Sequence, residues 1–237
     1  MRPGPPGLVE PWSRRGFVAA GLAGALPLGG CAGDVAFNYR VTVSVRRGGE
    51  TIVGSNVRRL RWHQGIEQLG FMDVSSYRTR GEATLVALEK GPLLATLAYK
   101  TFNRDLQAWY VESDVWTPDA AFRRVFGADR ASWRRKPGRP VELTPAEFPL
   151  LVTFRDPQDP QSVTEVDPDD LQPHFGPGVA LKSITVEVTR HAPTRGLKRQ
   201  LPWIVTLEGK TLSGDTAKGR STALGDNLYV SQLSSEN

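Results

Sequence analysis

The chain has one cysteine, Cys31, and its chemistry is the easiest in the sequence to infer. It follows Leu28-Gly29-Gly30. A lone cysteine cannot form an intrachain disulfide, and no second cysteine is present to share a metal ion with it. Cys31 is therefore a lone thiol, and the residues before it bear on its role.

A short apolar run precedes this cysteine. The run extends from Phe17 to Leu28 and consists mainly of Ala, Gly, Leu and Val. Arg14 and Arg15 precede it, separated from Phe17 by Gly16. The run is shorter than the ~20 residues of a bilayer helix, and its glycines and Pro27 disfavour a stable helix. A polar leader, two arginines and a short apolar segment are typical of an export signal. The alternative is an ordinary N-terminal helix with an incidental buried cysteine.

The stretch SRRGFV resembles a twin-arginine export motif, with Arg14, Arg15 and Phe17 as the recognised residues. Val18 and Ala19 depart from the leucine and lysine that are commoner there. The resemblance implies that the body of the chain folds before it is exported.

The stretch LGGC resembles the lipobox of bacterial lipoproteins, with Leu28 and Gly30 as its recognised residues. The resemblance implies cleavage between Gly30 and Cys31, with Cys31 becoming the acylated first residue. Residues 1–30 would then be a signal peptide and 31–36 a lipidated tether. The implied partner is the lipid bilayer and the implied location the periplasmic face of a membrane. In some bacteria an aspartate directly after the acylated cysteine favours retention in the inner membrane. Ala32 occupies that position here, which weakly favours the outer membrane.

Basic side chains gather in two predicted loops, 128–141 and 190–200. Either loop could contact anionic lipid headgroups, an acidic polymer or an envelope protein, and a solvated basic loop is the alternative. The chain's net charge of +5 is too small to indicate a dedicated nucleic-acid binder. In the first loop the candidate contact residues are Arg130, Trp133, Arg134, Arg135, Lys136 and Arg139.

Motifs for catalysis, metal binding and cofactors are absent from the sequence. His63, His174 and His191 lie far apart, and there is no G-x-S-x-G elbow, P-loop or dinucleotide fingerprint. The acidic loop 156–170 could bind a calcium ion, but its prolines favour turns and helix caps. We therefore expect no metal and no cofactor.

The body of the chain is predicted to be β-rich. Alternation over 37–46 and the glycine pair at 48–49 predict a hairpin, and 83–88 with 93–99 predict a second one. Further strands are expected at 150–154, 180–190 and 201–209.

Helices are expected to be few and short. The cap, proline and glycine signals at 117–127 predict the clearest helix, and single turns are expected at 143–149 and after Asp167. The stretch 63–80 has no clear period and is interpreted as a loop, 128–141 is the one candidate subdomain boundary, and the polar C-terminus is expected to fray.

These elements predict one β-rich α+β domain over 37–237, with antiparallel sheets built from hairpins and one or two short helices. The segments YRVTVSV, PLLVTFRDPQDPQSVTEVDPDDLQPHFGPGVALKSITVEVT and LPWIVTLEG resemble an uncharacterised family of proteobacterial envelope lipoproteins. That resemblance implies a location and a shared fold, without an activity. The hypothesis is a membrane-anchored, non-catalytic binding or scaffolding domain. The alternatives are an envelope hydrolase with an unrecognised active site and a secreted factor with a lipid- or polyanion-binding loop.

Overall fold

The computed structural model describes residues 34–63, 76–103, 108–112, 115–217 and 223–235. Two antiparallel sheets organise these residues, and helices are short, as the β-rich pattern predicts. Ala32–Asn237 forms one compact unit that contains every described element. Among the described residues, no helix has both the length and the apolar character needed to span a bilayer.

The larger sheet, sheet A, has six strands in the order β12-β3-β2-β1-β11-β8. Its centre is the hairpin of β1 (Val35–Arg47) and β2 (Glu50–His63), joined at Gly48-Gly49. The alternation of buried and half-buried residues along β1 agrees with the predicted strand, which begins two residues earlier than expected, inside the predicted tether. The other strands are β3 (Ser76–Glu82), β8 (Pro140–Glu142), β11 (Val179–Thr189) and β12 (Ser234–Ser235).

The smaller sheet has the order β10-β9-β5-β4. The predicted second hairpin is confirmed as β4 (Thr84–Leu88) and β5 (Gly91–Ala95), followed in the sheet by β9 (Leu151–Phe154) and β10 (Val163–Glu165). The two sheets meet where β2 passes β4: a Cβ on Gly54 would lie only 2.1 Å from the Leu85 carbonyl oxygen. A separate hairpin is made by β6 (Lys100–Asn103) and β7 (Ala108–Val111).

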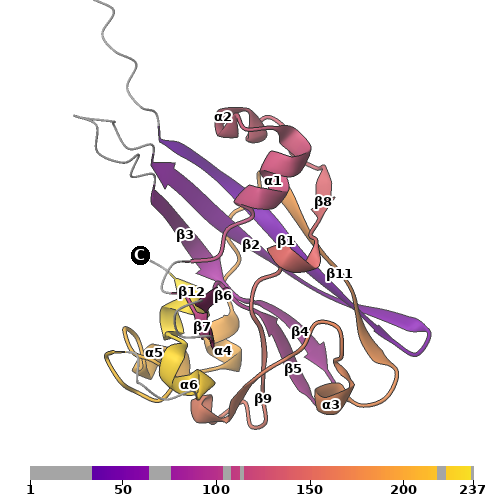
Figure 1. The fold of residues 1–237 in the computed structure, drawn as a ribbon, viewed down its shortest axis with the longest axis vertical. Coiled ribbons are helices and arrows are strands. Elements are labelled where there is room, and N and C mark those ends of the chain that lie inside the picture. The colour runs from indigo at the N-terminus through magenta and orange to yellow at the C-terminus, as the bar shows by residue number, and fades with distance from the viewer. Residues whose placement is uncertain (1–33, 64–75, 104–107, 113–114, 218–222, 236–237) are drawn as a thin grey trace, which may run out of the picture. The chain divides into compact units, whose positions relative to one another are not determined.

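The helices cover two hydrophobic cores. In Figure 1, α1 (Asp119–Phe126) and α2 (Arg130–Trp133) lie beside sheet A, and Phe122 and Trp133 pack on Phe37 of β1 in the first core. The second core joins the smaller sheet to the C-terminal third of the chain. The remaining short elements are η1 (Pro145–Glu147), η2 (Pro160–Ser162), α3 (Gln172–Phe175), α4 (Leu197–Gln200), α5 (Trp203–Thr206), α6 (Leu224–Asn227) and η3 (Val230–Gln232).

Three predictions from the sequence are wrong. The segment 201–209 contains the helical turn α5 instead of a strand. The strand β3 begins at Ser76, inside the predicted loop 63–80, of which 64–75 lie outside the described residues. The C-terminal segment is packed up to Ser235: Leu228, Val230 and Leu233 are buried, because they complete the second core.

Candidate anion-binding site

The outer face of sheet A carries four arginines on two neighbouring strands. Arg59 and Arg61 come from β2, and Arg78 and Arg80 from β3; we call these four residues the arginine quartet. The strand register places Arg59 opposite Arg80 and Arg61 opposite Arg78. Residues directly opposite in an antiparallel pair have Cβ atoms about 5 Å apart, so two rungs of the sheet each carry two guanidinium groups.

The four side chains are exposed and largely without counter-ions. Among the described residues, only Arg61 has an acidic partner, with its Nε 3.8 Å from Asp34 Oδ2. Elsewhere on the same face Arg40 is paired with Glu187 at 3.3 Å. Like charges directly opposite in a sheet destabilise it, so this arrangement is not explained by folding. A depression of about 170 Å³ is lined by the four arginines alone.

A second depression of about 170 Å³ adjoins the first and shares Arg59 and Arg80 with it. It gains Arg195 from the segment 193–196, because Thr194 is bonded to β2: the Val57 N–H donates to Thr194 Oγ1, and the Thr194 N–H donates to the Val57 carbonyl. One carboxylate, Glu82, also lines this depression. Its Oε2 accepts the Leu197 N–H at 3.0 Å, which anchors the start of α4. The second predicted basic loop therefore extends the quartet by one cation.

In the first predicted basic loop, 128–141, two of the expected contact residues make internal contacts. Trp133 is fully buried in the first core and donates its ring N–H to the Gly127 carbonyl at 2.9 Å. Arg130 donates to both oxygens of Asp119, at 2.6 and 3.0 Å, and lies 4.7 Å from the ring centroid of Trp62. Both residues stabilise the fold, and the predicted contact with an anionic surface is wrong for Trp133, which is buried.

The remaining residues of that loop are nearer to the surface. Lys136 donates to the Phe126 carbonyl at 3.2 Å, and Arg139 lies over the Phe126 ring at 5.6 Å. Arg134, Arg135 and Arg139 are exposed. Three of the six predicted contact residues are therefore exposed arginines, but only Arg134 and Arg135 are adjacent in sequence. They form no opposed rungs like those of the quartet.

The acidic loop 156–170 forms a series of turns. The carboxylates of Asp156, Asp159, Asp167 and Asp170 each accept the backbone N–H two residues further along the chain. Glu165 pairs with Lys100 at 2.8 Å. These bonds are the local turn chemistry that the prolines and aspartates favour. In the described part of the chain, no group of three or more His, Cys, Asp and Glu side chains is arranged to hold a metal ion.

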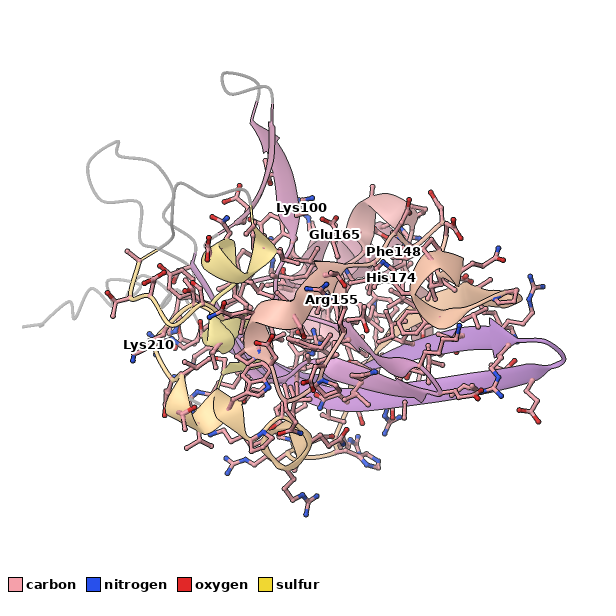
Figure 2. The ribbon with its side chains drawn as sticks, turned by 90° about the horizontal axis from the view of Figure 1, so that it is seen from below. Lys100, Phe148, Arg155, Glu165, His174 and Lys210 are labelled. Carbon is pink, nitrogen blue, oxygen red and sulfur yellow. The ribbon has the colours of Figure 1, made fainter. Side chains whose placement is uncertain are left out.

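Two larger pockets lie away from the quartet. One of about 550 Å³ is lined by Tyr77, Trp116, Asp119 and Glu147, among others. A more open one of about 1030 Å³ is lined by Lys100, Phe148, Glu165 and His174, which lie near one another in Figure 2. The quartet contributes to neither of them.

The carboxylates of the first of these pockets are both held by arginines. Asp119 is bound by Arg130, and Glu147 accepts from Arg124 at 2.7 and 3.1 Å. Burial alone would raise the pKa of Glu147, but hydrogen bonds from Arg124 and Thr144, with the charge of Arg124, hold it below its usual value. A carboxyl group with a lowered pKa is a poor proton donor at neutral pH. Glu147 is therefore not the raised-pKa acid that a glycosidase-type hydrolase needs.

The three histidines lie apart. His63 pairs with Asp34 at the surface beside Arg61, His174 lines the open pocket, and the His191 backbone carbonyl accepts from Asn38. The predicted signal residues Arg14, Arg15, Phe17, Leu28, Gly30 and Cys31 lie outside the described residues.

The quartet could have been found from two short patterns in the sequence. Arginines alternate with other residues at 59 and 61 and again at 78 and 80, as they would on one face of two strands. The pairing was missed because 63–80 was interpreted as a loop, which removed the second strand.

Comparisons with known proteins identify no family: neither protein-family models, nor curated proteins, nor solved structures match this chain.

Proposed function

We propose that this protein is a lipid-anchored envelope protein whose folded unit, Ala32–Asn237, is a non-catalytic module that binds anionic groups through the arginine quartet. The observation that carries the binding half is the pair of opposed arginine rungs, Arg59–Arg80 and Arg61–Arg78, on an exposed sheet face. The anchoring half rests on the sequence of residues 12–31, with its two arginines and its Leu-Gly-Gly-Cys end.

The chemistry of arginine supports an oxyanion as the ligand. A guanidinium presents a planar fork of donors that matches phosphate, sulfate or carboxylate, and it keeps its charge at every physiological pH. A small surface depression lined by four such groups suits several neighbouring anionic groups better than one enclosed small molecule. A binding role also agrees with the arginine-bound carboxylates of the 550 Å³ pocket.

The anchor is tested by replacing the thiol. The change Cys31→Ser should give an unacylated protein that is not processed to mature size and that leaves the membrane fraction after alkaline extraction. Metabolic labelling with a fatty acid should mark the wild type and leave the variant unlabelled. A Cys31→Ser protein that still fractionates with the membrane at mature size would rule the anchor out. In parallel, Arg14→Lys with Arg15→Lys should block export if the twin-arginine route is used.

The quartet is tested by removing its charge. In the folded unit, changing Arg59, Arg61, Arg78 and Arg80 to Gln should weaken binding to inorganic polyphosphate by about tenfold or more, since each exposed arginine near an anionic surface contributes about 1 kcal/mol. Fluorescence anisotropy of labelled polyphosphate at two salt concentrations measures this. The quartet variant should unfold at the same temperature or higher, because like-charge contacts are relieved.

The control changes Arg134, Arg135 and Arg139 to Gln, which removes three exposed positive charges from the first basic loop, one fewer than the quartet variant removes. This variant should bind polyphosphate within about twofold of the wild type, because the charges lost form no opposed rungs and are screened by salt. If both variants lost polyphosphate affinity equally, binding would depend on the overall positive charge and not on the quartet, which would contradict the proposal.

A further inference from the structure

We propose that the anionic groups bound by the arginine quartet are the headgroups of the membrane that holds the anchor, so that one end of sheet A docks on its own bilayer. This inference rests on the proposed function and deepens it by naming the partner of the same site. It follows from where the quartet lies along the strands.

The quartet lies at the end of sheet A where the chain enters the fold. β1 begins at Val35, and Ala36 and Asn38 lie opposite Arg61 and Arg59. β3 begins at the same end, because its first residue, Ser76, pairs with the last residue of β2. Both arginine rungs, which β2 and β3 form, therefore lie beside the first four residues of β1.

Covalent geometry keeps this end close to Cys31. Four Cα–Cα steps separate Cys31 from Val35, so whatever path the linking residues take, these two Cα atoms are at most about 15 Å apart. At about 3.4 Å per residue, the rung of Arg59 lies about 10 Å further along β1. An acyl chain on Cys31 would thus hold all four guanidinium groups within reach of the headgroup region.

The opposite end of sheet A differs from the anchored end in how its arginines are arranged. β1 runs for 13 residues before it reaches the turn at Gly48-Gly49, so the far end lies about 40 Å beyond Val35. Arg46 and Arg47 are exposed there, but Arg47 has a counter-ion in Glu89 at 3.0 Å. That end carries no opposed pair of arginines, since Arg46 lies opposite Thr51 and Arg47 lies opposite Glu50.

A surface of this kind need not bind tightly to act. An acyl anchor already confines the domain to the membrane, so headgroups are presented to the quartet at high effective concentration. Several arginines near an anionic leaflet then suffice to choose one orientation of the domain among many. The physical role of the quartet is to set the orientation of a domain that is anchored covalently.

The test uses the unacylated folded unit, beginning at Ala32, and vesicles at low ionic strength. The probes are vesicles of phosphatidylcholine alone and vesicles that also contain phosphatidylglycerol, with soluble polyphosphate in a parallel titration. The near-end variant is Arg61→Gln with Arg78→Gln. Its matched control, Arg46→Gln with Arg47→Gln, removes the same formal charge from the far end of sheet A, on β1.

We expect co-sedimentation with the anionic vesicles and none with the neutral ones. The near-end variant should lower the vesicle affinity by about fivefold or more, and the far-end variant should stay within about twofold of the wild type. The inference is overturned if anionic vesicles are not bound, or if the two variants behave alike. Polyphosphate binding that depends on the quartet, without vesicle binding, would leave the proposed function standing and overturn only the choice of membrane. Loss of both would overturn both.

Discussion

Two adjacent arginines of β2 have opposite surroundings because the side chains of a strand alternate between its faces. Arg59 is exposed in the quartet, whereas Arg58 is 0% exposed. Arg58 donates to the carbonyls of Glu82, Ala95 and Thr96 and to the Thr84 hydroxyl. Burial lowers the pKa of Arg58, although these oxygens remain around its guanidinium. Arg58 therefore joins the two sheets from the inside while its neighbour faces solvent.

Replacing Arg58 should destabilise the fold strongly. Arg58→Met would leave three buried carbonyls without their donors, and breaking buried charged networks costs about 3–5 kcal/mol. Urea denaturation of the folded unit measures the change. The matched control is Arg59→Met, which should change the free energy of unfolding by no more than about 0.5 kcal/mol. Similar values for the two variants would contradict the assigned roles.

At the scale of elements, local sequence patterns were sufficient to predict a strand or helix where one of its faces is apolar. The valines of β1 at every second position predicted that strand, and the signals at 117–127 predicted α1, which has Gly127 at its C-cap as expected. Pro118 instead of Thr117 stands at its N-cap, without a side-chain capping bond. β3 was missed because its inward residues are Thr79 and Gly81. The space beside them is taken by Arg58, whose Cγ would lie 3.0 Å from a Cβ on Gly81. No local signal shows that a buried arginine from another strand fills that place.

The segment 201–209 shows tertiary packing overriding β propensity. Its residues Trp203, Ile204 and Val205 favour a strand in isolation. In the structure Pro202 precedes the helical turn α5, Trp203 packs on Phe154, and its ring N–H donates to the Pro157 carbonyl at 2.8 Å. Likewise Leu233 and Gln232 are held by backbone N–H groups of Ala83 and Leu97, both at 2.7 Å. Such distant partners were not visible in the sequence.

The turn η1 provides a prediction about pH. The pKa of Glu147 lies below its usual value in the folded state, because its hydrogen bonds with Arg124 and Thr144 outweigh the effect of burial. A lowered pKa stabilises the fold above the unfolded pKa, and this contribution is lost as the pH falls through the folded pKa. Glu147→Gln should therefore lower the free energy of unfolding at neutral pH, and the difference from the wild type should shrink in acid.

Urea denaturation at a series of pH values measures this difference, with Glu142→Gln as the control on the neighbouring strand β8. A Glu147→Gln effect that stays constant from neutral to acid pH would show that the carboxylate charge is not what stabilises η1.

At the scale of the whole molecule, the candidate site depends on contacts between parts of the chain that are distant in sequence. The quartet needs β2 and β3 to pair in one register, and its extension needs Thr194 to bond to Val57. The sequence predicted basic contact surfaces in the loops 128–141 and 190–200 only, because residues that cluster in sequence are easier to recognise than residues that strand pairing brings together. The predicted anchor, by contrast, is local, and its residues can be read directly from the chain.

The most direct measurement of the central claim is an NMR titration of the arginine side-chain Nε–Hε signals of the folded unit with inorganic polyphosphate. Each arginine reports its own contact, so no substitution is needed beyond those used for assignment. The account predicts that the signals of Arg59, Arg61, Arg78 and Arg80 shift together and saturate at one concentration, while those of Arg134, Arg135 and Arg139 stay in place. Shifts confined to the 134–139 stretch, or spread evenly over all exposed arginines, would contradict it.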